Sequence, residues 1–335
     1  MNACADHAPI DAVVTWVDGN DPGHRAKREA ALRKLGKAPA TQSIIPAGKD
    51  PTRFQDNGEI RWCLHSIRKF APWIRTIHLV TDNQVPAFLT EAKQKELGVR
   101  IVDHTEIFRG YEWALPTFNT RTIESALWRI EGLAERFVYF NDDFVILQPV
   151  PQEDFFIDGK VVCRGQWKSI KRFGPFTLRV RKILNFWLKK ILGVVHTMHK
   201  KQQMDSARSA GFTKRYYHIG HVPHPQRKST IETFFQNCPK SFEENVAYPF
   251  RSIEQYSVIF LAYHLEIQRD NVVYEERSDG TMVSGQKIFG ISPKKALSLL
   301  EEGRRKFLCL QNFEDFDHGS REAIATRLDR LLGID

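Results

Sequence analysis

The chain of 335 residues lacks the features that mark several common protein classes. No apolar run reaches the roughly 18 residues that a membrane-spanning helix requires. The first ten residues, MNACADHAPI, lack the basic and hydrophobic regions of a signal peptide. The five cysteines are scattered and form no C-x-x-C pair, so neither a disulfide framework nor a zinc site is indicated. We therefore expect a globular cytoplasmic protein with reduced cysteines.

Acidic residues are missing from one long segment. Between Gly159 and Met204 there are twelve Lys or Arg and no Asp or Glu, so the net charge of +9 leaves −3 for the remainder of the chain. A basic charge confined to one segment, without a nucleic-acid-binding module or an aromatic-rich platform, argues against a nucleic-acid partner. A non-catalytic protein that binds another polyanion stays open as an alternative.

Short apolar runs alternate with helical patterns in the first half. Strands are expected at 10–17, 75–81, 99–104 and from 137 onward, where β-branched and aromatic residues cluster. Between them lie helical patterns, one of which follows a possible cap at Asn119 or Thr120. This order predicts an α/β fold with a doubly wound, mostly parallel, Rossmann-like sheet. The second half is expected to be mainly helical.

Acidic side chains follow the predicted strands, at Asp18, Asp82, Asp103 and the pair Asp142-Asp143. Ligands of such sheets bind outside the carboxyl ends of the strands, although Asp also favours turns. Neither G-x-G-x-x-G nor G-x-x-x-x-G-K-[ST] is present, so a nucleotide would be held in another way. Adjacent carboxylates repel unless a cation or water lies between them. The pair therefore suits a Mg²⁺ or Mn²⁺ ion that bridges pyrophosphate oxygens.

The basic segment contains an amphipathic stretch at 178–202. In VRKILNFWLKKILGVV, apolar residues recur with helical spacing from Val180 to Val195, and lysine and arginine lie off that stripe. This pattern is typical of a helix that lies on an anionic membrane surface. It equally fits a helix packed on its own domain with a solvated basic face.

Two further clusters in the second half suggest chemistry. His221 and His224 flank Pro223 in a stiff segment, and their spacing leaves open a metal pair, a general base with its neighbour, or two surface residues. Arg251 precedes an S-x-x-Q pattern that predicts a helix start. An arginine at a helix N-terminus suits a phosphate clamp, and the alternative is an exposed arginine.

Four separated blocks of the chain together resemble the Stealth family, which includes bacterial capsule polysaccharide phosphotransferases and the animal lysosomal-enzyme N-acetylglucosamine-1-phosphotransferase. They cover about half of the chain in the family's order. The blocks are IDAVVTWVDGNDP, RFQDNGEIRWCLHSIRKFAPWIRTIHLVTDNQ through LPTFNTRTIES to YFNDD, GHVPHP through YPFRSIEQYSVIFLAY, and KFLCLQN.

The resemblance implies a sugar-1-phosphate transferase with a nucleotide-sugar transferase-like sheet. Such an enzyme moves a sugar 1-phosphate from a nucleotide-sugar, expected to be a UDP-sugar, to a hydroxyl of an oligosaccharide or polysaccharide acceptor. The products are a phosphodiester and a nucleoside monophosphate, and the expected place is the inner face of a bacterial membrane where capsule polymer is made. A metal-dependent glycosyltransferase that releases a nucleoside diphosphate is the alternative, since it shares the sheet and the acidic pair.

The resemblance also implies a role for each cluster. His221 would be the general base, and Arg251 would hold the transferring phosphoryl group. Asp142 and Asp143 would bind Mg²⁺ or Mn²⁺. Relatives commonly have a carboxylate where this chain has Asn312, and a metal role for this amide is open. The expected substrate-binding residues are Asp18, Gly19, Asn57, Arg61, Asn119 and His224.

The implied organisation has three segments. Residues 1–158 would form the α/β half that binds nucleotide-sugar and metal, and 159–204 a basic amphipathic insertion. Residues 205–335 would form a helical half that completes the active site, within one catalytic domain overall.

Overall fold

The computed structural model describes residues 8–36, 57–171, 199–276, 279–285 and 293–334. The predicted amphipathic stretch at 178–202 lies outside these residues except for its last four positions, which belong to α7 (His199–Ser209). Its possible contact with a membrane therefore stays a prediction. Among the described helices, none has the length and apolar character needed to cross a bilayer.

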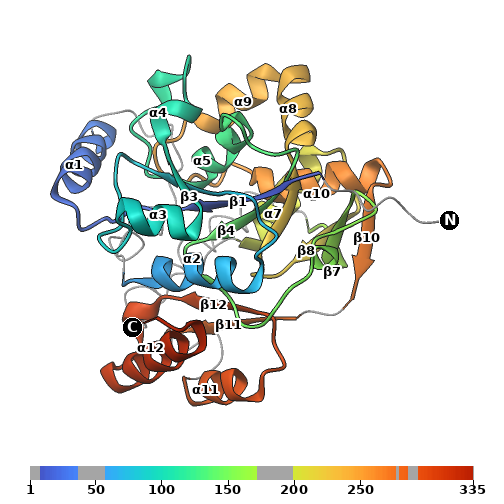
Figure 1. The fold of residues 1–335 in the computed structure, drawn as a ribbon. Helices are drawn as coiled ribbons and strands as arrows, with labels where there is room; N and C mark the ends of the chain where they lie inside the picture. Colours follow the sequence, from blue (N-terminus) through green and yellow to red (C-terminus); the bar gives the residue numbers. More distant parts are fainter. Residues whose placement is uncertain (1–7, 37–56, 172–198, 277–278, 286–292, 335) are drawn as a thin grey trace.

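The central sheet has five strands in the order β3-β2-β1-β4-β9. The strands of the first half run parallel, and Figure 1 shows them across the middle of the molecule. They are β1 (Ile10–Thr15), β2 (Ile77–Thr81), β3 (Val99–Asp103) and β4 (Arg136–Asn141). This order confirms the predicted doubly wound parallel sheet. It reverses between β1 and β4, and a crevice at their carboxyl ends is the usual ligand site of such sheets.

Three helices of the first half, α1 (Pro22–Gly36), α2 (Glu59–Phe70) and α5 (Thr120–Ala126), form where helical patterns predict them, whereas α3 (Glu91–Leu97) and α4 (His104–Ile107) were not predicted. Ile60, Cys63, Leu64 and Ile67 are buried on one face of α2. Asn119 caps α5 through its side chain, which accepts the N–H of Arg121.

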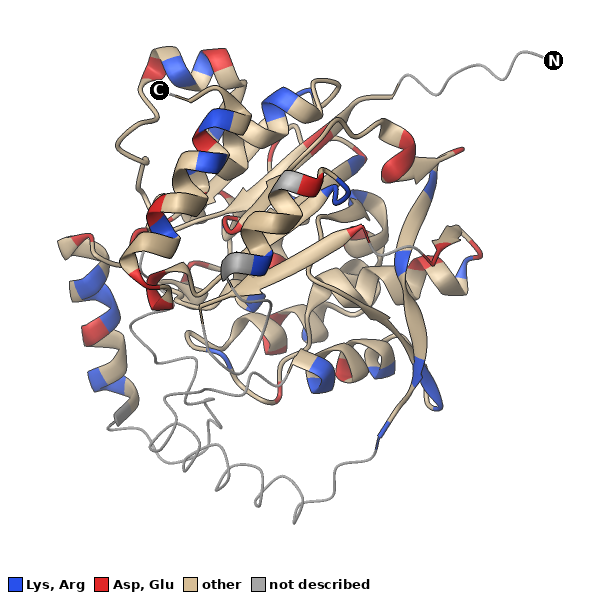
Figure 2. Cartoon of the chain, turned by 90° about the horizontal axis from the view of Figure 1, so that it is seen from below, with Lys and Arg blue, Asp and Glu red and all other residues tan. Residues whose placement is uncertain are grey.

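The described part of the second half is mainly helical, as predicted. Its remaining helices are α8 (Lys228–Asn237), α9 (Pro239–Val246), α10 (Val258–Gln268), α11 (Pro293–Glu302) and α12 (His318–Leu332). Figure 2 shows Lys and Arg interspersed with Asp and Glu along such helices. Charged residues of both signs are typical of solvated helix faces.

The second half also contributes strands that the sequence did not indicate. β9 (His224–Arg227) pairs antiparallel with β4 at the edge of the central sheet, where Pro225 is tolerated. The others are β8 (Arg215–Ile219), β10 (Val272–Glu275), β11 (Gly280–Ser284) and β12 (Phe307–Gln311), with β5 (Phe144–Ile146), β6 (Phe156–Ile157) and β7 (Lys160–Ser169) as partners from the middle of the chain.

One buried cluster joins both halves of the chain. It contains Phe140 from β4, Phe260 from α10, Leu310 from β12 and Leu328 from α12. Because burial of this apolar surface stabilises the folded state, segments far apart in the sequence are held in fixed places around the sheet. The predicted segment boundaries at 158 and 204 stay predictions.

Candidate active site

A pocket of about 310 Å³ opens at the carboxyl ends of β1 and β4, where the strand order reverses. Its lining includes Thr15 at the end of β1 and the acidic pair that follows β4. The second half closes the pocket with His221 and Arg251, which are distant in the sequence. The pocket thus lies at the place expected for this sheet topology.

The acidic pair forms one wall of this pocket. Asp143 is held from β12, because its carbonyl oxygen accepts the N–H of Leu310 at 2.9 Å. The Cys309 thiol donates to Oδ2 of Asp143 at 3.4 Å, and burial together with the charge of Asp143 raises the pKa of that thiol. Asn312 follows β12 in a left-handed conformation and lines the same pocket. The fold therefore brings Asp142, Asp143 and Asn312 together.

This wall fits a partial metal site. Among the described residues, no group of three His, Cys, Asp or Glu side chains is placed to hold a metal ion. Mg²⁺ is usually held by one or two carboxylates with substrate phosphates and waters, and it does not require a complete protein cage. Asp142 and Asp143, with the amide oxygen of Asn312, offer donors of the kind that it prefers. The metal itself stays a prediction.

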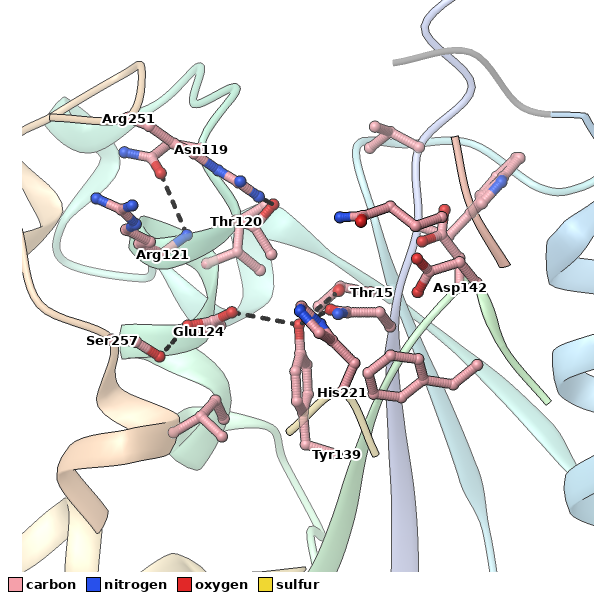
Figure 3. Close-up of a pocket in the computed structure, with 18 of the residues that line it drawn as sticks. Thr15, Asn119, Thr120, Arg121, Glu124, Tyr139, Asp142, His221, Arg251 and Ser257 are labelled. Carbon is pink, nitrogen blue, oxygen red and sulfur yellow. Dashed lines mark hydrogen bonds between the residues drawn. The ribbon is translucent and has the colours of Figure 1, made fainter. Parts of the chain in front are cut away.

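His221 lies in the middle of the pocket. Figure 3 shows its ring between Asp142 on one side and Arg121 and Arg251 on the other. Burial lowers the pKa of His221, and the charge of Asp143 offsets part of that shift. The imidazole is therefore neutral near pH 7 and able to accept a proton.

Two further histidines surround His221. His224 is buried on β9, and burial lowers its pKa to about 3. His199, which the sequence analysis did not select, places its ring 4.7 Å from that of His221 with 23° between the planes. Because His199 lies within the basic segment and belongs to no motif of its own, no local signal pointed to it.

Arginines form the wall opposite the acidic pair. Nη2 of Arg251 donates to the Thr120 hydroxyl at 3.0 Å, and Nη1 of Arg121 donates to the carbonyl of Ser252 at 2.6 Å. Arg121 was not selected from the sequence, where it resembles an ordinary residue of a capped helix. Its partner Ser252 directly follows Arg251, so α5 and the Arg251 loop are joined here.

The helix predicted directly after Arg251 begins later. α10 starts at Val258 with Ser257 as its N-cap, which corrects the placement of Arg251 at a helix N-terminus. The S-x-x-Q hydrogen bonds do form, since Ser252 accepts the N–H of Glu254 and Gln255 accepts the N–H of Ser252. These hydrogen bonds stabilise a turn and not the first turn of a helix, because the chain bends before the apolar run of α10.

A buried amide network fixes the Arg251 loop. Both N–H groups of the Asn119 side chain are used, one by the carbonyl of Tyr248 at 2.9 Å and one by Oε1 of Gln255 at 2.8 Å. Gln255 in turn donates to the Thr122 hydroxyl and to the carbonyl of Asn245. The geometry thus gives Asn119 a positioning contact with the loop. Its predicted contact with substrate stays a prediction.

A buried carboxylate links the two walls. Glu124 accepts the Ser257 hydroxyl at 2.9 Å, and the Tyr139 hydroxyl lies 3.5 Å from its other oxygen. Tyr139 also contacts Thr15 at 3.0 Å and Asn141 at 2.8 Å, as Figure 3 shows in part. Burial raises the pKa of Glu124 although hydrogen bonds and nearby arginines oppose the shift. Neither Glu124 nor Tyr139 was predicted.

Four predicted substrate-binding residues lie outside the lining of this pocket. Asp18 and Gly19 lie in the turn after β1, where the Asp18 carboxylate accepts the N–H of Asn20 at 2.8 Å. The amide of Asn57 donates to Glu59 at 3.2 Å, and it is Glu59 that lines the pocket. Arg61 lies in the first turn of α2. Their contacts with substrate stay predictions.

Comparisons with known proteins identify conserved regions in the first half. The model of Stealth protein conserved region 1 matches residues 8–36, and that of conserved region 2 matches residues 53–163. An exopolysaccharide phosphotransferase of Mycobacterium tuberculosis, CpsY, is 32% identical over 331 residues, which cover 97% of this chain and 57% of that protein.

Two other relatives carry similar names. An exopolysaccharide phosphotransferase of Streptomyces coelicolor is 32% identical over 76% of this chain and 25% of its own length. The capsular polysaccharide phosphotransferase cps12A of Actinobacillus pleuropneumoniae is 39% identical over 44% of this chain and 38% of its own. The chain thus spans between a quarter and three fifths of the length of these relatives.

The solved structures that match this chain include glycosyltransferases of low sequence identity. The galactosyltransferase LgtC, solved with donor and acceptor sugar analogues, is 12% identical, with a TM-score of 0.38 over 83% of this chain and 92% of that one. Mouse xyloside xylosyltransferase 1 is 9% identical, with a TM-score of 0.35 over 90% of this chain and 97% of that one. From the two conserved regions and the named relatives, the chain belongs to the Stealth family.

Proposed function

We propose that this protein is a phosphotransferase of capsule or exopolysaccharide synthesis. It transfers a sugar 1-phosphate from a nucleotide-sugar, expected to be a UDP-sugar, to a hydroxyl group of a saccharide acceptor. The single observation that carries the proposal is the position of His221, between a carboxylate wall and an arginine wall in one pocket. The names of the relatives support transfer in polysaccharide synthesis.

His221 supplies the base in this proposal. Burial favours its neutral imidazole, so a ring nitrogen accepts the proton of the acceptor hydroxyl while the hydroxyl oxygen attacks phosphorus. The bond between that phosphorus and the oxygen bridging to the nucleotide breaks, and the nucleoside monophosphate leaves with the bonding electron pair. The sugar stays attached to the transferred phosphorus throughout.

The two walls provide charge neutralisation. The Arg251 guanidinium donates to the non-bridging oxygens of the transferring group, where negative charge spreads during such reactions. Mg²⁺ bound by Asp142 and Asp143 would neutralise the donor diphosphate. The carboxylates orient the nucleotide-side phosphate of the donor, and the arginine wall receives the sugar-bearing phosphate.

Nucleotide analysis tests the proposal. The protein is incubated with a panel of UDP-sugars, Mg²⁺ and an oligosaccharide acceptor, and the released nucleotide is separated by chromatography. We expect UMP with the wild type and a loss of at least about a hundredfold in His221→Gln. His318→Gln, at a histidine with an 87% exposed side chain, is the matched control and should keep full activity. Release of UDP would instead support the metal-dependent glycosyltransferase.

The segment 178–202 belongs to this proposal as a membrane contact. Its amphipathic pattern suits an anionic surface at which capsule polymer is assembled. Flotation with vesicles containing anionic lipid tests it. Binding by the wild type that disappears when Lys189 and Lys190 are replaced by Glu is expected, and absence of wild-type binding would contradict it.

A further inference from the structure

Two arginines from distant parts of the chain meet on one wall of the pocket. Arg121 belongs to the first turn of α5 and is only 6% exposed, and Arg251 lies in the loop before α10. Both side chains line the cavity. Burial and the neighbouring charge of Arg251 lower the pKa of Arg121 to about 9. Two like charges held out of water repel, so this arrangement is costly unless an anion accompanies it.

Neutral groups hold the two guanidinium groups in place. Arg251 donates to the hydroxyl of Thr120, and Arg121 donates to the carbonyl of Ser252. Within the described ranges of the chain, neither arginine has a carboxylate oxygen within ion-pair distance. These contacts fix the geometry of the arginines but cancel none of their charge.

The carboxyl groups near the two arginines interact with other residues. Asp205 forms ion pairs with Lys201 and with Arg208, the latter at 2.6 Å. Glu124 accepts a hydrogen bond from the Ser257 hydroxyl, burial raises its pKa, and its single carboxyl group lies near both arginines without forming an ion pair. The arginine wall therefore keeps a positive charge that faces the cavity.

We infer that Arg121 and Arg251 together form a site for a phosphate dianion, in which Arg121 is a second arginine that contacts the phosphate. Guanidinium groups present planar sets of N–H donors that match pairs of phosphate oxygens. A dianion offsets both charges, whereas a monoanion offsets only one. This explains why the fold keeps a nearly buried arginine beside Arg251.

The inference deepens the proposed function and rests on it for the identity of the phosphate. In the proposed reaction, the bound group is the sugar-bearing phosphoryl group of the donor, which carries one negative charge and approaches a dianion as the acceptor oxygen adds to phosphorus. It enters with its oxygens toward the arginines, while the nucleotide-side phosphate faces the acidic wall. Arg121 then stabilises the charge that develops on the phosphoryl oxygens.

Binding of inorganic phosphate tests the inference without turnover. Phosphate is titrated into the full chain by calorimetry with EDTA present, so that no divalent metal can bring phosphate to the acidic wall. We expect saturable binding by the wild type and at least tenfold weaker binding by Arg121→Gln and by Arg251→Gln. Arg121→Lys keeps the charge but loses the planar donor set, and should weaken binding several-fold. Arg109→Gln removes an exposed charge away from the pocket and should bind as the wild type.

Thermal unfolding without phosphate shows which variants are folded. A folded Arg121→Gln that binds phosphate like the wild type would overturn the inference and leave Arg121 as a tether for the Ser252 loop. If Arg121→Gln does not fold, Arg121→Lys provides the test. An affinity for phosphate equal to that of the wild type in Arg121→Lys would then overturn the inference. Phosphate binding that depends on Arg121 in a protein that releases no UMP would refute the proposed function and leave this site standing.

Discussion

The ring of His199 stacks on that of His221, with 4.7 Å between the centroids and 23° between the planes. This contact limits the rotation of the candidate base, which lies in a loop before β9. We predict that His199→Ala lowers kcat about tenfold, because small displacements of a catalytic group are costly. His199→Phe keeps a flat ring and should retain most of the activity, with KM little changed in both variants. Equal losses in the two variants would show that stacking is not the role of His199.

Gly280 on β11 is predicted to position His221. A Cβ atom at Gly280 would lie 2.4 Å from Cγ1 of Val222 and 3.5 Å from the carbonyl oxygen of His221. Gly280→Ala must therefore push the His221 segment away, and we expect kcat to fall at least about tenfold. Gly220→Ala is the matched control, since its Cβ meets nothing within 4 Å, and it should keep activity near that of the wild type. Steady-state rates that do not differ between the two variants would contradict this assignment.

The amide of Gln255 should stabilise both the fold and the arginine wall. It accepts from Asn119 and from the backbone of Ser252, so Gln255→Leu leaves buried donors without acceptors. Each such group costs about 1–3 kcal/mol, and we predict a loss of about 2 kcal/mol in the free energy of unfolding. Urea unfolding measures this loss. The exposed Gln236→Leu serves as the control and should change stability by less than about 0.5 kcal/mol. An equally small change in the free energy of unfolding of Gln255→Leu would contradict the stabilising role of the amide network.

The lowered pKa of His224 predicts how the free energy of unfolding depends on pH. The folded protein holds the pKa of His224 at about 3, against an ordinary value of 6.5 in the unfolded chain. Between these values the unfolded state binds more protons, so the stability contributed by the neutral imidazole is present above pH 6.5 and is lost as the pH falls. The slope is about 1.4 kcal/mol per pH unit for this group. Urea unfolding at about pH 7 and about pH 5 should show a smaller drop in His224→Gln than in the wild type, and an equal drop would contradict the prediction.

Much of the sheet and part of the site could be predicted from local sequence. The strand before Asp142 is apolar and β-branched, and its polar exit marks the end of a parallel strand. The convergence of Asp142 and His221 followed only from the family resemblance, because spacing cannot show that segments about 80 residues apart meet. The structure brings both into one pocket.

The unpredicted residues depend on tertiary contacts. Arg121 and Glu124 are three positions apart on α5, which places them on one helix face, and this spacing was the available signal. The Arg251 loop determines which part of the protein this face of α5 contacts. The start of α10 was predicted too early, because Ser252 and Gln255 make cap-like hydrogen bonds in a turn. β9 was missed since its proline and polar residues do not resemble a strand.

The acidic pair should determine metal affinity. Asp142→Asn and Asp143→Asn each remove one negative charge from a wall that offers hard oxygen donors. We expect Mn²⁺ binding, followed by electron paramagnetic resonance in the presence of a UDP-sugar, to weaken at least about tenfold in each variant. Asp317→Asn alters an exposed cap of α12 and should bind Mn²⁺ like the wild type. Unchanged Mn²⁺ affinity in both pocket variants would contradict the proposed metal wall.

The central claim is that the bond to phosphorus breaks and the bond from sugar carbon to oxygen survives. A UDP-sugar labelled with ¹⁸O between the sugar anomeric carbon and phosphorus is the direct test, with the product read by ³¹P NMR and mass spectrometry. The proposed transfer predicts a phosphodiester that retains the label between sugar and phosphorus, together with unlabelled UMP. Labelled UDP, with a sugar product that carries neither phosphorus nor label, would contradict it.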